Sequence, residues 1–420
     1  MSRKKTALRA SIDATFLNGI ADVIIKSLTS GPLLTTYVFC FGMGNAILGF
    51  LQSVIPWSNL FHLPVSYFLE KNYSAKKIAC LSSLFSRPFL FLAALAFLIP
   101  DKTTGFLLFS ISYCLFFSIT GITAGAFWPW CKMLVPHTVM TGFFAHRIKY
   151  ILLAKIITIG ATTLIISSVS KNYQETYIYF VFFMTAFAVG CFYTYTLFKM
   201  KDVNLKASTD IPFIKKFSLC LSNKPFISFF CRIGFCNFTL AFFTPFSFSF
   251  LLKELNLPIS LSFCFSLAST LIDILFVDFW KKYTYKKGIS NMLSLSSLCF
   301  CLAILPLFLL SVKSKIIPYF LLSISFIFIG MGNSGMNFGI SDSVISFSPK
   351  ENSSIYISLL NVGRFFFCGL GSFSAGITLD ILSLWTIQNY ACFFILCFIL
   401  FYTSNILAKS IRPFSSAPPL

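Results

Sequence analysis

Residues 66–77 read Ser-Tyr-Phe-Leu-Glu-Lys-Asn-Tyr-Ser-Ala-Lys-Lys and form a short charged segment between two long apolar stretches. Three landmarks of the first half of the chain recur 210 to 213 residues further on: Glu70-Lys71 with Lys76-Lys77 at Lys281-Lys282 with Lys286-Lys287, Pro32 at Pro245, and Pro136 at Pro349. Three pairs that share nearly one spacing indicate an internal duplication. The sequence therefore predicts two parallel halves with the same order of apolar segments.

The composition indicates the class of protein. Hydrophobic residues make up 57% of the 420 residues, charged residues only 11%, and the mean hydropathy is +0.83. A soluble domain carries about a quarter charged residues, so this chain has too little polar surface for a protein dissolved in water. A membrane span needs ~20 mostly apolar residues. Such stretches lie at approximately 10–39, 45–69, 78–99, 105–130, 150–170, 176–198, 226–252, 259–280, 289–311, 317–345, 355–379 and 388–408.

The spans are expected to be helices, because the period-two alternation of outer-membrane barrel strands is absent from the sequence. We predict an all-α membrane protein with twelve transmembrane helices in two parallel six-helix repeats. A polar segment at 199–225 separates an N-terminal bundle, 1–198, from a C-terminal bundle with a short tail, 226–420. The stretch 10–39 is longer than the apolar core of a cleavable signal peptide, so we interpret it as an uncleaved first span.

The net charge of +20 invites an assignment to nucleic acid, but the distribution of the charges favours another explanation. With the N-terminus in the cytoplasm, only a few of the 33 basic residues fall on the outer side: Lys102, Lys171, Lys253, Lys313 and Lys315. This asymmetry matches the positive-inside rule. We therefore expect a multi-pass protein of the cell membrane, typical of a bacterial inner membrane, with both termini cytoplasmic. The bilayer and a small-molecule substrate are the expected partners, without nucleic acid, and the expected functional unit is a monomer.

No pattern in the sequence indicates catalysis, a metal or a cofactor. The 14 cysteines lie mostly inside apolar stretches and have no zinc-ligand spacing. Gly330-Met-Gly-Asn-Ser-Gly335 matches a dinucleotide-binding pattern, but it lies within an apolar span instead of after a strand. Small residues at such a position let two helices approach closely. We therefore expect no enzyme activity and no bound cofactor.

Two loops resemble those of the major facilitator superfamily. Between the second and third spans the family has a glycine, an acid–base doublet, a second glycine and two basic residues. Residues 66–77 keep the doublet and the basic pair but lack both glycines. Between spans four and five, three segments resemble a bacterial branch of the family: Trp128-Pro-Trp130, Leu134-Val135-Pro136 and Gly142-Phe143-Phe144-Ala-His146-Arg147. The resemblance implies a two-lobed secondary transporter that works by alternating access.

The resemblance also implies that charged groups on these loops act as a gate. Contacts at one end of the bundle must form in one state and break in the other, and charge-assisted bonds at helix ends can serve that purpose. The predicted gating residues are Glu70, Lys71, Lys76, Lys77, Arg147 and Asp278. The alternative is that these groups form an ordinary solvated, positive-inside loop.

Ionisable residues inside the spans are costly and usually face the interior of the bundle or a water-filled cavity. Asp22 and Lys26 are four residues apart on one face of the first span, where they can pair. We interpret the pair as a substrate or coupling site; the alternative is a structural pair that neutralises itself. Asp273 and Arg364 are expected to approach each other in the second half. Asp22 or Asp273 is the hypothetical proton carrier, because burial raises the pKa of a carboxyl group.

Other polar groups in the spans complete the candidate site. Asn237 and Asn333 are expected to hydrogen-bond a substrate, or else to join helices. Arg87 and Arg232 could contact an anion, or bond to backbone carbonyls. The excess of cations among these groups favours an anionic or zwitterionic solute, transported with a proton or solute gradient. The alternatives are a non-transporting sensor or assembly protein of the same fold, and a lipid or drug exporter.

Overall fold

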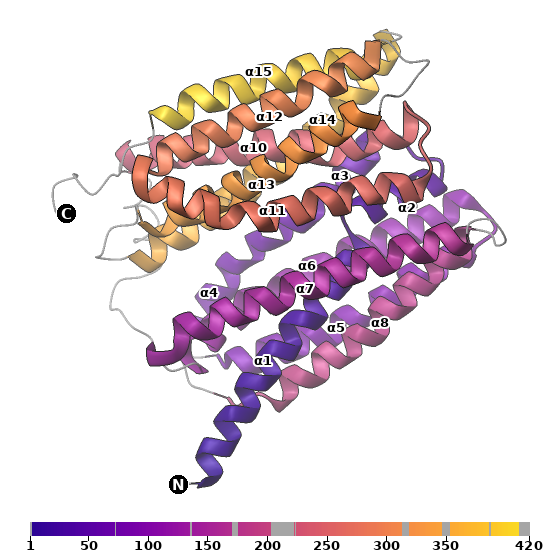
Figure 1. The fold of residues 1–420 in the computed structure, drawn as a ribbon. Helices are drawn as coiled ribbons and strands as arrows, with labels where there is room; N and C mark the ends of the chain where they lie inside the picture. The colour runs from indigo at the N-terminus through magenta and orange to yellow at the C-terminus, as the bar shows by residue number, and fades with distance from the viewer. Residues whose placement is uncertain are drawn as a thin grey trace. The chain divides into compact units, whose positions relative to one another are not determined.

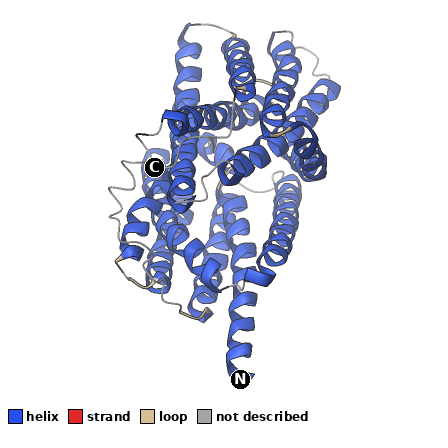
Figure 2. Cartoon of the chain, turned by 90° about the vertical axis from the view of Figure 1, so that its left-hand side faces the viewer, coloured by secondary structure: helices blue, strands red, loops and turns tan. Residues whose placement is uncertain are grey.

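The computed structural model describes residues 2–71, 73–134, 137–169, 175–202, 222, 224–312, 319–346, 353–385 and 388–410. Within these ranges the regular elements are all helical (Figure 2). The first half contains α1 (Ser2–Thr29), α2 (Pro32–Cys40), α3 (Asn45–Ser58), a 3-10 turn (Asn59–Phe61), α4 (His62–Glu70), α5 (Ala75–Leu95), a second 3-10 turn (Ala96–Leu98), α6 (Lys102–Leu134), α7 (His137–Val169) and α8 (Glu175–Lys199). The second half contains α10 (Lys224–Lys253), α11 (Ile259–Lys287), α12 (Ile289–Val312), α13 (Tyr319–Ser346), α14 (Ser353–Trp385) and α15 (Asn389–Lys409) (Figure 1).

The described helices confirm the predicted fold class. Eleven of the candidate spans in the described residues are long and apolar enough to cross a membrane. The second predicted span, 45–69, is not among them because it is divided into α3, a 3-10 turn and α4. Pro56 lies inside α3 just before that division, where its ring removes one helix hydrogen bond. The divided span and the other eleven together give the twelve that we predicted.

Local sequence explains where the first helices begin and end. Gly31 has φ +65°, a conformation that favours glycine, and Pro32 then occupies the first turn of α2. Gly42 has φ +78° in the turn between α2 and α3. The Ser74 hydroxyl caps α5 by accepting the backbone N–H of Lys77 at 3.2 Å. These breaks place α1 with α2, and α3 with α4, as two spans with an interruption in each.

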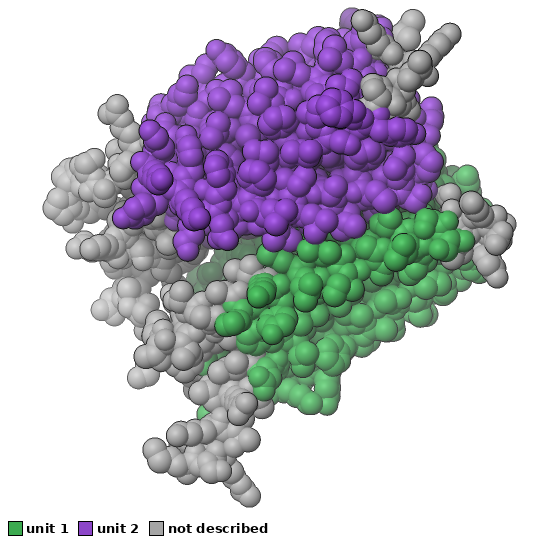
Figure 3. Space-filling view, in the orientation of Figure 1, with its two compact units in different colours: residues 1–43, 54–210 green, residues 44–53, 211–420 purple. Residues whose placement is uncertain are grey.

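The chain forms two compact units, shown in different colours in Figure 3. Unit 1 contains Met1–Met43 and Val54–Asp210, and unit 2 contains Gly44–Ser53 and Ile211–Leu420. The first part of α3 thus belongs with the second half of the chain. The predicted linker, 199–225, lies largely outside the described residues, so its cytoplasmic position and the predicted domain boundaries stay predictions.

Aromatic side chains fill the interior of each unit. In unit 1, the buried Tyr37 of α2 lies 4.9 Å from Tyr179 of α8 and 5.5 Å from Phe97, between ring centroids. In unit 2, Phe300 of α12 stacks on Phe401 of α15 at 4.4 Å. Stacked and edge-to-face arrangements at these separations are favourable beyond the area that the rings bury. Many of the numerous phenylalanines therefore serve to pack the helices together.

The glycine-rich segment of α13 is a packing surface. A Cβ atom at Gly330 would lie 2.5 Å from a backbone oxygen of α11, and one at Gly335 would lie 2.0 Å from the Ser296 hydroxyl oxygen of α12. The indole N–H of Trp280 on α11 donates to the Met331 carbonyl at 3.0 Å. Small residues here permit α13 to approach both neighbours, as the sequence predicted.

Candidate functional site

The charged pair on α1 is the first component of the site. The ammonium of Lys26 donates to Asp22 Oδ2 at 2.8 Å, as the i, i+4 spacing predicted. The two side chains keep 47% and 34% of their accessible surface. A charged pair that stays accessible in an apolar span is expected to face a water-filled space instead of lipid. The pairing is therefore confirmed, whereas its role in binding or coupling stays a prediction.

Arg87 on α5 is a buried cation with neutral partners. Only 4% of its surface is exposed. Its Nε donates to the Thr194 hydroxyl at 3.0 Å and its Nη2 to the Ser83 hydroxyl at 2.9 Å. Its guanidinium carbon lies 5.0 Å from the centre of the Tyr193 ring and 5.8 Å from the Phe116 ring.

The remaining terminal nitrogen of Arg87, Nη1, is buried without a hydrogen-bond partner in the described structure. It lies beside α8, where a Cβ atom at Gly190 would be 2.9 Å away. An unsatisfied buried donor is costly, and such groups are rare outside functional sites or sites of bound water. This nitrogen is therefore available to an acceptor that enters the site.

Arg147 on α7 is the second buried arginine of unit 1. It is 7% exposed, and its Nε donates to the Thr15 carbonyl of α1 at 3.4 Å. The guanidinium carbon lies 5.2 Å from the Trp128 ring and covers Gly19, where a Cβ atom would meet it at 2.8 Å. The predicted gating residue is thus packed against α1, not exposed on a loop.

Polar side chains of α1 and α8 complete this group. Asn18 is buried and its amide donates to the Thr196 hydroxyl at 3.4 Å. The hydroxyls of Ser83 and Thr194 share a hydrogen bond of 2.7 Å. Sequence reasoning missed Thr194 and Thr196, because an uncharged hydroxyl in an apolar span gives no signal that separates a buried network from ordinary lipid-facing sequence.

The electrostatics of unit 1 are dominated by cations. Asp22 lies close enough to both Arg87 and Arg147 to interact with their charges. Its one ion pair among the described residues is with Lys26. We call Asp22, Lys26, Arg87 and Arg147 the α1 charge cluster. Three cations surround one carboxylate, so the cluster can accept one further anionic group.

The predicted residues of unit 2 do not form a comparable cluster. Asn237 is buried and donates to the carbonyl of Ile233 in its own helix at 2.8 Å. Arg364 stacks on the Phe365 ring at 5.0 Å, and its buried Nε has no hydrogen-bond partner. The Asp273 carbonyl accepts the hydroxyl of Ser334 at 2.7 Å.

The expected approach of Asp273 to Arg364 is not found: among the described contacts, Arg364 has no ion pair with Asp273. The reason lies in the packing, because α11 packs mainly on α13 whereas α14 packs mainly on α10. Asn333 on α13 is half-buried. Arg232 on α10 donates to the Ser410 carbonyl, as the alternative interpretation of this residue predicted.

The predicted gate between α4 and α5 is partly described. The side chain of Glu70 lies outside the described residues, whereas the Lys71 ammonium lies over the Tyr67 ring at 4.7 Å. A hydrogen bond to the Tyr67 hydroxyl raises the pKa of Lys71. Lys76 is half-buried and Lys77 is exposed.

An additional residue joins this loop from the far end of unit 1. The Ser74 hydroxyl donates to Asp202 Oδ2 at 2.9 Å. The sequence placed Asp202 only in the linker, since nothing local connects two positions so far apart. A gate built from this loop therefore includes Asp202 as its described acid.

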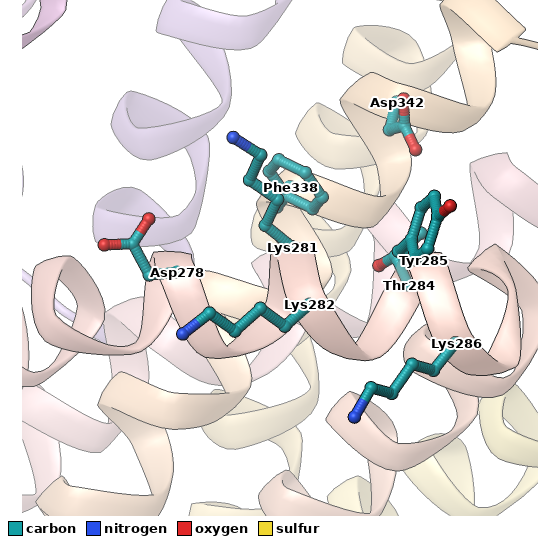
Figure 4. A pocket seen from close by; sticks show the side chains of 8 residues that line it. All are labelled: Asp278, Lys281, Lys282, Thr284, Tyr285, Lys286, Phe338 and Asp342. Carbon is teal, nitrogen blue, oxygen red and sulfur yellow. The ribbon is translucent and has the colours of Figure 1, made fainter.

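A cavity of about 500 Å³ lies at the end of α11. It is lined by charged and aromatic side chains of α11 and α13, namely Asp278, Lys281, Lys282, Thr284, Tyr285, Lys286, Phe338 and Asp342 (Figure 4). The predicted gating residue Asp278 is exposed at its rim. In Figure 4 the three lysines do not converge on one point. No group of three or more metal-ligating residues is found within the described residues.

Comparisons with known proteins identify the fold. No family model and no curated sequence matches the chain. Solved structures do match it: a variant of the nucleoside transporter NupG has a TM-score of 0.70 and 14% identity, over 95% of this chain and 98% of that one. A D-xylose–proton symporter has a TM-score of 0.73 and 10% identity, over 99% of both chains.

A third match extends the comparison. A POT family transporter in complex with 5-aminolevulinic acid has a TM-score of 0.72 and 11% identity, over 98% of this chain and 96% of that one. At these identities the likeness concerns the fold. The chain is therefore a multi-pass helical membrane protein with the fold of the major facilitator superfamily.

Proposed function

We propose that the protein is a secondary active transporter that moves a small solute across the membrane by alternating access. Two kinds of support favour this proposal. The structures with the same fold include nucleoside, sugar and peptide transporters. The chain also carries accessible and buried charges inside its spans, which are expensive unless they serve a solute or ion pathway. Both observations favour a transporter over an enzyme.

The substrate that the α1 charge cluster fits best is anionic or zwitterionic. The observation that carries this assignment is Arg87, which is buried, bonded to neutral hydroxyls and left with an unpaired Nη1. Removing a cation from water costs several kcal/mol unless it is paired. A planar guanidinium binds carboxylate and phosphate groups through two parallel hydrogen bonds. An entering anion would therefore satisfy both the charge and the donor.

The other predicted residues have roles within this proposal. Asp22 and Asp273 are the candidate proton carriers, while Lys26, Asn237, Asn333 and Arg364 are candidate substrate contacts. The loop lysines, Glu70, Arg147 and Asp278 are candidate gating residues. The protein is proposed to act as a monomer in a bacterial inner membrane with both termini cytoplasmic, and to consist of two six-helix bundles joined by the linker.

One observation favours a second candidate, a membrane sensor or assembly protein that has the fold without transport. Both glycines of the loop pattern between the second and third spans are missing from residues 66–77. A loop that has lost its glycines is less able to make close backbone contacts. A lipid or drug exporter, the third possibility, would depend little on Arg364.

Reconstituted protein can decide among these candidates. Purified protein is placed in liposomes that contain a fluorescent pH reporter, and pools of organic acids, amino acids, sugars and nucleosides are added outside. Proton movement with the organic-acid or amino-acid pool is the expected result. A response to sugars or nucleosides alone would contradict the substrate class. Silence with every pool, from protein that elutes as a folded species, would contradict coupled transport and favour the sensor.

A further inference from the structure

Asp380 on α14 makes a contact that the sequence did not predict. Its carboxylate accepts two backbone N–H groups at the start of α3: Asn45 N–H donates to Oδ1 at 3.1 Å and Ala46 N–H to Oδ2 at 2.8 Å. We call these two bonds the Asp380 cap. The first N–H groups of a helix have no partner within the helix, and the helix dipole favours a negative charge there. Here the capping acid comes from a helix more than 300 residues away.

The backbones of α3 and α14 are in close contact just beyond the cap. A Cβ atom at Gly49 would lie 2.5 Å from the Ser372 carbonyl oxygen, and one at Gly376 would lie 2.4 Å from the Asn45 carbonyl oxygen. Gly44 allows a similar approach of the acid, since its Cβ atom would be 3.1 Å from Asp380 Oδ2. Any larger residue at Gly49 or Gly376 would separate the helices.

Side chains of α10 and α15 extend the cap into a polar network. Asn45 Oδ1 accepts the Ser249 hydroxyl at 3.3 Å and the Lys253 ammonium at 3.5 Å. The Ser249 hydroxyl also shares a hydrogen bond of 2.8 Å with the Tyr390 hydroxyl. The start of α3 is therefore bound to three helices of unit 2, although its own sequence belongs to the first half of the chain.

The unit boundary falls inside α3, after Ser53. The first ten residues of the Gly44–Ser53 segment pack with unit 2, while Val54 and the residues that follow pack with unit 1. An element that divides in this way must change its contacts whenever the two halves of the chain move as separate bodies. The Asp380 cap lies at the end of the element where such a change would begin.

We propose that the Asp380 cap is the charge-dependent contact that keeps α3 closed on α14, and that opening on this side of the membrane requires it to break. The positive-inside pattern places this side outside the cytoplasm. A carboxylate that accepts two helix N–H groups forms strong, charge-assisted bonds, which a neutral amide cannot replace, because its nitrogen would face an N–H. The inference rests on the proposed alternating access, but it concerns opening and not solute binding.

The accessibility of a cysteine at position 372 measures this opening directly. Ser372 is 4% exposed, lies against Gly49, and donates to the Ala241 carbonyl at 3.3 Å. Ser372→Cys is made in a background whose native cysteines are replaced by serine. Its rate of reaction with a membrane-impermeant methanethiosulfonate is then measured in intact proteoliposomes. Because no solute is needed, failure of the proposed transport and failure of this inference are distinguishable.

Three further substitutions are compared in that background. Asp380→Asn is expected to raise the labelling rate roughly tenfold or more, the factor that corresponds to one lost charge-assisted bond. Gly44→Ala keeps the acid but crowds Oδ2, so it is expected to raise the rate by a smaller factor. The matched control is Asp101→Asn: Asp101 also caps a helix, α6, through the backbone N–H groups of Thr103 and Thr104, but it joins no second helix.

The control is expected to leave the labelling rate unchanged. An unchanged rate in Asp380→Asn, with protein of normal elution and thermal stability, would overturn the proposal. An equal rise in Asp101→Asn would also overturn it, because the effect would then come from helix capping in general.

Discussion

Replacing Arg87 by glutamine separates a binding role from a structural one. The change removes the guanidinium that bonds to Thr194 and Ser83 but leaves a side chain that can bond to one hydroxyl. Two hydrogen bonds from a charged group contribute about 3–6 kcal/mol in total. Keeping a cation away from water costs several kcal/mol in the opposite direction. The two effects nearly cancel, so the free energy of unfolding is expected to change by less than about 2 kcal/mol.

The effect of Arg87→Gln on transport is expected to be much larger. Removing one member of a buried charge pair costs at least about 2–5 kcal/mol of binding free energy. A loss of 2.7 kcal/mol corresponds to about a hundredfold. Initial uptake rates in proteoliposomes should therefore fall about a hundredfold, while thermal unfolding in detergent changes little.

The matched control for Arg87 is Lys199→Gln. Lys199 is another cation of unit 1 that lies over an aromatic ring, that of Tyr195 at 4.4 Å, but it is exposed at the end of α8. It is expected to keep uptake within about twofold, as surface charges contribute little. Uptake in Arg87→Gln within threefold of the parent would refute the binding role. Unfolding of that variant with normal uptake per folded molecule would assign Arg87 a structural role.

Three further predictions follow from the described contacts. Asp22→Asn together with Asp273→Asn should abolish proton movement in the pH-reporter assay, since no proton carrier is left; unchanged movement would disprove the coupling hypothesis. Gly335→Ala should lower thermal stability by about 1–3 kcal/mol because its Cβ would overlap a hydroxyl oxygen at 2.0 Å, whereas Gly160→Ala, with no atom within 4 Å, should be neutral or stabilising. Bonds from the hydroxyl and N–H groups of Thr104 lower the pKa of Asp101, so its cap on α6 is present above the pKa of the unfolded chain and is lost as the pH falls through the lower folded value; amide exchange at the start of α6 should rise over that range and not in Asp101→Asn.

Features that depend on local spacing could be predicted from the sequence. The composition and the repeat near 213 residues predicted the twelve spans, and the i, i+4 spacing predicted the Asp22–Lys26 pair. The glycines of α13 were correctly assigned to packing. Each of these follows from periodicity along one helix or from the apolar length that a bilayer requires.

Features that depend on how distant helices pack could not be predicted. Nothing near Asp380 indicates that it caps a helix that begins at Asn45, because the contact joins two different parts of the chain. The expected Asp273–Arg364 pair failed for the same reason, since it assumed that α11 and α14 are neighbours. The environment of Arg87 depends equally on which residues of α8 face α5. One local signal was overlooked: the glycines around the α2–α3 turn mark a helix start that needs a cap.

Accumulation against a gradient tests the central claim most directly. Proteoliposomes with a pH gradient imposed across the membrane are given a radiolabelled solute from the pool that moved protons. The proposed transporter should accumulate this anionic or zwitterionic solute above its external concentration, lose the accumulation when a protonophore is added, and fail to accumulate it in Arg87→Gln. Equal concentrations on both sides of the membrane at every time point, with or without the pH gradient, would contradict secondary active transport.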